Sequence, residues 1–230
     1  MEDKEDISKN LESQPSVEIK PLTQYNKSQY PQLLGEVMRV EREAWPVEWQ
    51  ATREKFEARL EVFPEGFFLA FANGQLAGVT TAEIVQFDPK KPPETWDEVT
   101  ENGYIRKTHN RAGNALYVVS VGVAPEFQGQ GIGRELMDAQ KQLARNLNLK
   151  YLFLGARIPQ FSQFHKSYPE VTVGQYVNSE ENPGRKLDAE IRFYESCDLK
   201  VRKVVPNYGP DPESENFGVI MVWENPDLKK

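Results

Sequence analysis

The chain has 230 residues, of which 39% are hydrophobic and 27% are charged, and its formal net charge is -7 at pH 7. This composition is typical of a globular protein, and the acidic excess argues against a nucleic-acid partner. No apolar run approaches the roughly 20 residues that span a bilayer, and the charged N-terminus does not resemble a signal peptide, so we expect a cytoplasmic protein with no membrane partner. A lone cysteine and two histidines predict no disulfide and no metal site.

In chain order, we expect a disordered N-terminal tail over residues 1–16 and a single domain over residues 17–230. Apolar periodicity predicts the first elements: a strand at 17–22, helices at 30–45 and 52–63, and strands at 67–72 and 75–87. Asn73-Gly74 favours a type I′ turn between the last two strands. Trp45, Trp49 and Phe63 either fill the core or line a site, and we expect core for most of them.

Residues 88–114 form a long proline-rich and then polar segment with one short helical piece at 95–100. Loops beyond about 12–15 residues without structure of their own tend to be functional or disordered. Two interpretations stay open: a lid over a substrate, or a surface insertion that caps the sheet.

The most informative stretch is a strand at 116–123, a glycine-rich turn at 128–133 and an amphipathic helix at 132–147. Glycines let the backbone approach a ligand closely, and the first N–H groups of a helix carry the positive end of its dipole. The turn therefore suits a phosphate group, to which Arg134 would add a charged contact. It matches neither the dinucleotide fingerprint nor a Walker A loop.

The last third predicts a short strand at 150–154, which lies beside the strand at 116–123 and diverges from it. Further elements follow: irregular or short helical structure at 160–183, a helix at 188–197, and paired strands at 199–205 and 217–223. Four aromatic residues of the irregular segment are candidates for a pocket near an acceptor site: Phe161, Phe164, Tyr168 and Tyr176.

The strand that ends in Val123-x-Pro125, followed by Gln128-x-x-Gly131-x-Gly133 at a helix start, resembles motif A of the GNAT N-acetyltransferase superfamily. The segment 191–195, with Tyr194, resembles that family's F-Y-E segment, although Asp198 and Leu199 stand where the family usually has Gly-Phe. The resemblance implies the GNAT-type acyl-CoA N-acyltransferase fold. It belongs to the α/β (α+β) class, with a central mixed, mostly antiparallel sheet of about seven strands and flanking helices.

The same resemblance implies acetyl-CoA as the acyl donor, with its pyrophosphate on the loop amides and its pantetheine arm along the preceding strand. The implied cofactor-binding residues are Val121, Gly122, Val123, Gln128, Gly129, Gln130, Gly131, Ile132, Gly133 and Arg134. Tyr194 is the implied catalytic residue, which would protonate the departing thiolate. A backbone N–H near 121–123 would meet the oxyanion.

The general base is not identified, because the strand at 116–123 carries no carboxylate. Glu83, His109 and Asp97 are candidates by region only. Ser120 has no identified histidine partner, and Cys197 is better explained as a small buried hydrophobe, so neither favours a covalent mechanism.

The segments 155–159, 205–208 and 211–214 resemble more narrowly the GNAT-type domains fused to carbon–nitrogen hydrolases. Three functions stay open: an N-acetyltransferase for a small primary amine, a non-catalytic acyl-CoA-binding module that partners a separate hydrolase, and a protein N-acetyltransferase. We expect the first, with a pocket closed by 88–114 and 160–183. A homodimer is also left open.

Overall fold

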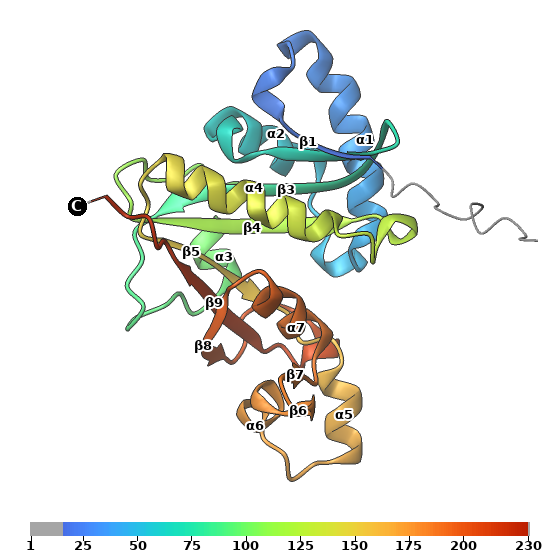
Figure 1. Cartoon of the computed structure of the whole chain (residues 1–230), viewed down its shortest axis with the longest axis vertical. Coiled ribbons are helices and arrows are strands. Elements are labelled where there is room, and N and C mark those ends of the chain that lie inside the picture. Colours follow the sequence, from blue (N-terminus) through green and yellow to red (C-terminus); the bar gives the residue numbers. More distant parts are fainter. Residues whose placement is uncertain (1–15, 230) are drawn as a thin grey trace, which may run out of the picture.

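The computed structural model describes residues 16–229, so of the predicted tail only Ser16 falls within it. Its centre is a seven-stranded sheet with the order β1-β2-β3-β4-β5-β9-β8 (Figure 1). The strands are β1 (Val17–Pro21), β2 (Phe68–Ala72), β3 (Gln75–Val85), β4 (Ala115–Val123), β5 (Tyr151–Ala156), β8 (Lys200–Val205) and β9 (Gly218–Glu224). Only β4 and β5 pair in parallel within this sheet. The predicted fold class is confirmed.

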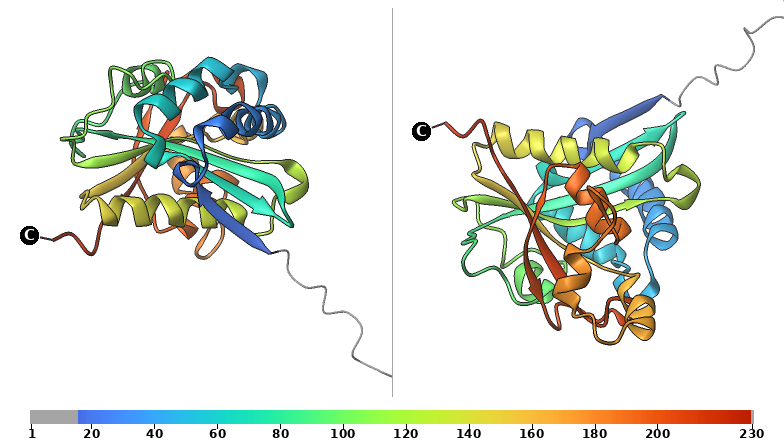
Figure 2. Two further views of the ribbon diagram at one scale, coloured as in Figure 1. Left: turned by 90° about the horizontal axis from the view of Figure 1, so that it is seen from above. Right: turned by 60° about the horizontal axis from the view of Figure 1, so that its bottom comes forward.

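Helices cover both faces of the sheet. They are α1 (Tyr30–Ala44), α2 (Arg53–Val62), α3 (Trp96–Thr100), α4 (Ile132–Asn146), α5 (Phe161–Ser167), α6 (Val173–Asn178) and α7 (Ala189–Ser196). Short 3₁₀ turns lie at Leu22–Gln24, Lys27–Gln29, Val47–Trp49, Pro64–Gly66, Pro125–Phe127 and Pro212–Ser214. Helix α4 packs on one face, whereas α1 and α2 pack on the other (Figure 2). The buried residues of α1 follow its predicted apolar stripe. The stripe predicted for α4 is only partly correct, because its buried face also includes Met137, Gln140 and Lys141, whereas Leu147 is exposed, and α2 buries Phe56, Ala58 and Arg59.

The hairpin between β2 and β3 turns at Asn73-Gly74, whose φ angles are 51° and 80°. Both values are positive, as the predicted type I′ turn requires. The two C-terminal strands β8 and β9 also pair as the alternating pattern predicts.

The sheet splits where β4 and β5 diverge. Their parallel pairing covers only Ala115–Tyr117 against Tyr151–Phe153, after which β5 continues along β9 as far as Ala156. The flank of β4 that faces β5 therefore has no strand partner beyond Tyr117. A bulge at Val119 shifts the register between β3 and β4 at the same level. The predicted divergence of the fifth strand is confirmed.

A buried tyrosine holds the two halves of the sheet together next to this split. Tyr208 lies against Gly155 of β5 and Gly218 of β9, where a Cβ on either glycine would overlap its ring. Its hydroxyl is 2.8 Å from the hydroxyl of Tyr117 on β4. The two glycines thus admit a large side chain between the strands, and the hydroxyl pair ties that side chain to β4.

Helices α5 and α6 and a two-stranded sheet form a lobe at the C-terminal half (Figure 1). The small strands are β6 (Glu180–Asn182) and β7 (Arg185–Lys186). None of the helices within residues 16–229 combines the length and the apolar composition that crossing a membrane needs.

Candidate functional site

The glycine-rich turn between β4 and α4 has the geometry of an anion cradle. Gly129 and Gly131 have φ angles of 76° and 85°, and Gly131 is the N-cap residue of α4. No atom outside the adjoining chain lies within 4 Å of a Cβ built on either glycine, so both face open space. The Gln128 amide donates to the carbonyl of Val123 at 3.0 Å and closes the turn onto the end of β4. The first N–H groups of α4 are therefore presented to a ligand.

A pocket of about 450 Å³ lies in front of this turn, and we call it the cradle pocket. Eight of the ten predicted cofactor-binding residues line it: Val121, Gly122, Val123, Gln128, Gly129, Gly131, Ile132 and Gly133. Gln130 and Arg134 are exposed and lie outside its lining. Ala44, Trp45, Phe127, Arg157, Ala189, Glu190, Phe193 and Tyr194 complete the wall.

Helix α7 supplies the wall opposite β4. Phe193 packs against α4 so closely that a Cβ on Gly133 would lie 3.0 Å from its ring. Tyr194 is buried, and burial raises its pKa well above the ordinary value, so its hydroxyl keeps its proton at neutral pH. One turn earlier, Glu190 is half-buried, and desolvation raises its pKa to about 8 against the opposing charge of Arg157.

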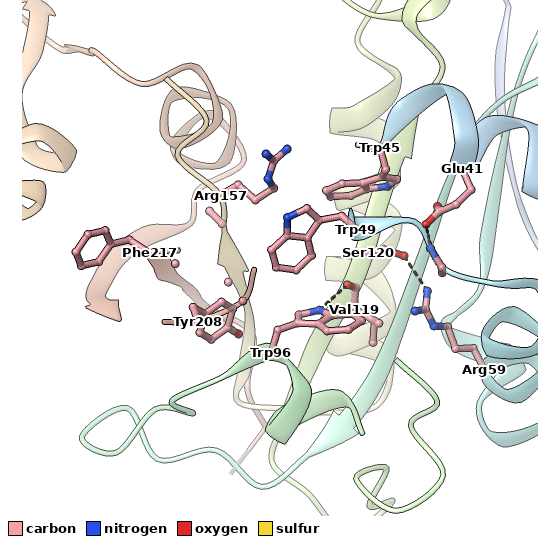
Figure 3. A pocket seen from close by; sticks show the side chains of 15 residues that line it. Glu41, Trp45, Trp49, Arg59, Trp96, Val119, Ser120, Arg157, Tyr208 and Phe217 are labelled. Atoms are coloured by element: carbon pink, nitrogen blue, oxygen red, sulfur yellow. Dashed lines mark hydrogen bonds between the residues drawn. The ribbon is translucent and has the colours of Figure 1, made fainter. Parts of the chain in front are cut away.

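A second pocket lies where β4 and β5 diverge, and we call it the aromatic pocket (Figure 3). The centre of a water molecule can reach about 40 Å³ of it. Its lining residues are Glu41, Trp45, Trp49, Ala51, Arg59, Trp96, Val119, Ser120, Gly155, Ala156, Arg157, Tyr208, Gly209, Phe217 and Gly218. Because Trp45 and Arg157 line both pockets, the two spaces adjoin.

Three tryptophans form the wall of the aromatic pocket. Trp49 meets Trp96 edge to face with 6.0 Å between ring centroids, and it packs directly over Gly209. The indole N–H of Trp96 donates to the carbonyl of Val119 at 3.3 Å and so gives the bulged residue of β4 a hydrogen-bond partner (Figure 3). Trp45 stands over Gly122, where a Cβ would lie 3.0 Å from its Nε1. The prediction that most of these aromatic residues fill the core holds for Phe63 and is wrong for Trp45 and Trp49.

Arg157 is fixed at the boundary of the two pockets by a pair of carboxylates. Its Nε and Nη2 donate to Asp211 at 2.7 and 2.9 Å, and Nη2 also donates to Glu213 at 2.7 Å. Burial alone would lower the pKa of Arg157, but these two carboxylates outweigh it and raise the pKa above the ordinary value. The guanidinium extends toward Trp49 and Trp45 (Figure 3).

Arg59 of α2 is a fully buried charge that lines the aromatic pocket. Its Nε donates to the carbonyl of Gly103 at 2.8 Å, and Nη1 donates to the hydroxyls of Thr81 and Ser120, both at 3.2 Å. No carboxylate of residues 16–229 forms an ion pair with it. Burial lowers its pKa to about 10, opposed by the charges of Glu41 and Glu83, so it remains a cation at neutral pH.

The carboxylate that lines the aromatic pocket is Glu41 of α1, which is 1% exposed. Its Oε1 accepts the backbone N–H of Ala51 at 2.7 Å (Figure 3). Within the described part of the chain, its Oε2 and the indole nitrogens of Trp45 and Trp49 are buried without a hydrogen-bond partner. These three atoms all belong to residues that line this one pocket.

None of the three bases expected by region lines either pocket. Glu83 of β3 is buried, and the Thr108 hydroxyl donates to its carboxylate at 2.7 Å. His109 accepts the backbone N–H of Ile84 through Nδ1 at 3.2 Å, and Asp97 is exposed. Ser120 does line the aromatic pocket, but it pairs with the Thr81 hydroxyl at 3.0 Å rather than with a histidine. Cys197 is buried, as expected.

The two segments expected to close the acceptor pocket differ in what they contribute. Residues 88–114 supply Trp96 to the lining of the aromatic pocket. Residues 160–183 supply no residue to that lining, which corrects the prediction that they help to close it. Phe164, Tyr168 and Tyr176 line a separate hollow on the lobe, and Phe161 is buried in the core. Among residues 16–229, no group of three or more His, Cys, Asp or Glu side chains is arranged to hold a metal ion.

Solved structures with the same fold include two GNAT-like domains and an acetyltransferase-type protein. The loading GNATL domain of CurA from Lyngbya majuscula has a TM-score of 0.73 at 18% identity, covering 91% of this chain and 98% of that one. The GphF GNAT-like decarboxylase in complex with isobutyryl-CoA has a TM-score of 0.71 at 17% identity, covering 91% and 99%. The yncA protein from Salmonella typhimurium, solved with its cofactor acetyl-CoA, has a TM-score of 0.51 at 16% identity, covering 93% and 96%.

Two proteins of Bacillus subtilis (strain 168) are related in sequence. The probable hydrolase YhcX is 31% identical over 195 residues, which are 84% of this chain but only 37% of YhcX. The uncharacterized N-acetyltransferase YkwB is 39% identical over 186 residues, which are 81% of this chain and 80% of YkwB. The model of the acetyltransferase (GNAT) family matches residues 30–163. The chain therefore belongs to the GNAT acetyltransferase family.

Proposed function

We propose that this protein is an acyl-CoA-dependent N-acyltransferase that moves an acetyl group from acetyl-CoA to a small primary amine. The observation that carries the proposal is the junction of the cradle pocket with the aromatic pocket, where β4 and β5 diverge. Family membership supports acyl transfer, and the acetyl-CoA of the yncA structure supports the choice of donor.

The cradle would hold the pyrophosphate of the donor on the first N–H groups of α4. The pantetheine arm would then run along the flank of β4, which has no strand partner beyond Tyr117. The amide groups of the pantetheine arm would pair with the free N–H and C=O groups of this flank. The thioester would reach the boundary between the pockets, next to Trp45 and Arg157.

Acetyl transfer joins the amine nitrogen to the thioester carbonyl carbon and breaks the carbon–sulfur bond. The oxyanion would be stabilised by a backbone N–H near Val121–Val123, a type of donor worth roughly 10²–10³ in rate. Tyr194, which keeps its proton at neutral pH, would donate to the departing sulfur.

The size of the aromatic pocket favours a small acceptor over a polypeptide. The space in it that the centre of a water molecule can reach is about 40 Å³, between tryptophan, tyrosine and phenylalanine side chains. A compact amine fits such a space, whereas a protein acceptor needs an open groove that accommodates several residues.

A second candidate function is decarboxylation of an acyl-CoA whose acyl group carries a carboxylate. The observation that favours it is Arg59, a buried cation that lines the aromatic pocket beside Ser120 and has no ion-pair partner in the described residues. In this reaction the bond between the α-carbon and the carboxylate breaks, carbon dioxide leaves, and the resulting enolate takes a proton at carbon. The GphF domain, which is described as a decarboxylase, shares the fold.

The test is to mix wild-type protein with acetyl-CoA and a panel of small amines, and to follow thiol release and the mass of the product. A parallel reaction contains malonyl-CoA without amine and is followed by carbon dioxide release. Amine-dependent thiol release with an N-acetyl product supports the proposal. Carbon dioxide release alone supports the second candidate, and binding of acetyl-CoA with neither reaction contradicts both and supports a non-catalytic binding module.

A further inference from the structure

Glu41 is the carboxylate of the aromatic pocket, and within residues 16–229 only one of its two carboxylate oxygens has a hydrogen-bond partner. Oε1 is held by the backbone N–H of Ala51 at 2.7 Å, which fixes the orientation of the carboxyl group. Oε2 is buried and has no hydrogen-bond partner within residues 16–229. A buried carboxylate oxygen without a donor is unfavourable, so its position calls for a donor that binds in the pocket.

Glu41 also stands beside the expected position of the thioester. Trp45, the C-cap residue of α1, donates its backbone N–H to the carbonyl of Glu41 at 3.1 Å, and both residues line the aromatic pocket. Trp45 lines both pockets and covers Gly122 of β4. A group bound to Oε2 is thereby placed in the small pocket that adjoins the predicted acyl end of the donor.

The charges around Glu41 favour a neutral amine as the reacting species. Burial raises the pKa of Glu41 above its ordinary value, against the hydrogen bond from Ala51 and the charges of Arg59 and Lys55, which makes it a stronger base than an exposed glutamate. The buried Arg59 cation disfavours an ammonium ion in the same pocket. The amine is therefore expected to react after its ammonium form has lost a proton to solvent, which leaves Glu41 free to take the proton that the nitrogen gives up during transfer.

The tryptophans add a second requirement. The indole nitrogen of Trp49 is buried and lacks an acceptor within the described residues, so a ligand that offers an oxygen atom would satisfy it. An acceptor that carries both an amine and an oxygen pairs with Oε2 of Glu41 and with the indole of Trp49, whereas a plain alkylamine leaves that indole unpaired.

We propose that Glu41 binds the acceptor amine and takes its proton, and that the acceptor is a small primary amine with a hydroxyl or carbonyl oxygen for Trp49. This rests on the proposed function. As the amine nitrogen bonds to the thioester carbon and the thiolate leaves, the surplus proton of the nitrogen passes to Oε2 of Glu41. The protonated Glu41 then releases it to solvent, and the thiolate is protonated separately.

The first test compares Glu41→Gln, Glu41→Asp and wild type, with Glu43→Gln as the matched control. Glu43 lies on the same helix, is exposed, and pairs with Arg39 at the surface. Glutamine keeps the acceptor for Ala51 but cannot take a proton. We expect Glu41→Gln to lower kcat/KM for the amine by about 10²-fold or more and to leave in the acidic limb of its pH profile only the ionisation of the amine itself. The dissociation constant for acetyl-CoA should stay within about 3-fold, and Glu41→Asp should recover part of the activity.

The second test compares ethanolamine with propylamine, which have equal numbers of heavy atoms. Because three tryptophans line the aromatic pocket, binding of either amine to the protein with coenzyme A is followed by tryptophan fluorescence. We expect tighter binding of ethanolamine by wild type and no preference in Trp49→Phe. Trp223→Phe, which removes an indole outside both pockets, should keep the preference.

The outcomes separate this inference from the proposed function. Amine acetylation by wild type that Glu41→Gln leaves within 3-fold overturns the role of Glu41 while the proposed function stands. Equal binding of the two amines by wild type overturns the acceptor class. Wild-type protein that binds ethanolamine through Glu41 without acetylating it supports the amine site and contradicts the proposed function.

Discussion

Gly131 allows the charge of the cradle to be tested separately from its backbone conformation. Its φ of 85° is in the left-handed region, and a side chain at this position would meet no neighbour. Gly131→Asn and Gly131→Asp should therefore fold, and both should lose stability by roughly 1 kcal/mol through the backbone alone. Asparagine and aspartate have nearly the same shape, so only the charge distinguishes their effects on the ligand.

The size of the charge effect follows from the position of Gly131 at the N-cap of α4. A carboxylate about 5 Å from a phosphate charge is repelled by about 1–3 kcal/mol for effective dielectric constants between 80 and 20. Gly131→Asp should therefore bind acetyl-CoA about 5- to 150-fold more weakly than Gly131→Asn. Calorimetric titration measures both dissociation constants, and the gap should narrow in 1 M salt. Equal affinities of the two variants at low salt would refute the placement of the pyrophosphate.

Three further perturbations probe the rest of the site and its support. Tyr194→Phe should lower kcat by about 10²–10⁴ and keep the dissociation constant for acetyl-CoA, and an unchanged kcat would contradict its role. Tyr208→Phe removes the hydroxyl that pairs with the buried Tyr117 hydroxyl and should cost about 1–3 kcal/mol in urea unfolding, whereas no loss would contradict the hydroxyl pair. Burial raises the pKa of Glu83 to about 8, so the native state holds a proton that the unfolded chain has released above about pH 4.3. As the pH rises, the stability of wild type relative to that of Glu83→Gln should thus fall by up to about 1.4 kcal/mol per pH unit and level off above pH 8. A stability difference between the two proteins that does not change with pH would exclude a proton on Glu83 in the native state.

Local sequence determines the cradle, which is why it could be predicted. The positive φ angles of Gly129 and Gly131, and the helix that begins at Ile132, follow from neighbouring residues. The Asn73-Gly74 turn is equally local. In each case the geometry is set within one short stretch, so no distant contact was needed to infer it.

The aromatic pocket could not be predicted in the same way, because distant segments build it. Glu41 comes from α1, Arg59 from α2, Trp96 from α3, and Tyr208 from the loop before β9. Whether Trp49 fills the core or lines a site depends on the divergence of β4 and β5, which its own neighbourhood does not encode. One signal was available: Arg59 interrupts the apolar face of α2 next to Phe56, and a charge in such a stripe indicates a buried polar contact.

The extent of the divergence between β4 and β5 could not be predicted from the sequence either. The three-residue pairing of β4 with β5 and the paired glycines around Tyr208 emerge only when the strands are in register. Arg157 is an example. It is held at the boundary of the two pockets by Asp211 and Glu213, which are distant from it in the sequence.

The most direct test of the central claim is the rate of thiol release from acetyl-CoA by wild-type protein, measured with and without ethanolamine. We expect saturable release that depends on the amine and yields one N-acetyl product per thiol. Release at the same rate without amine, or no release by protein that binds acetyl-CoA, would contradict transfer to an amine at the junction of the two pockets.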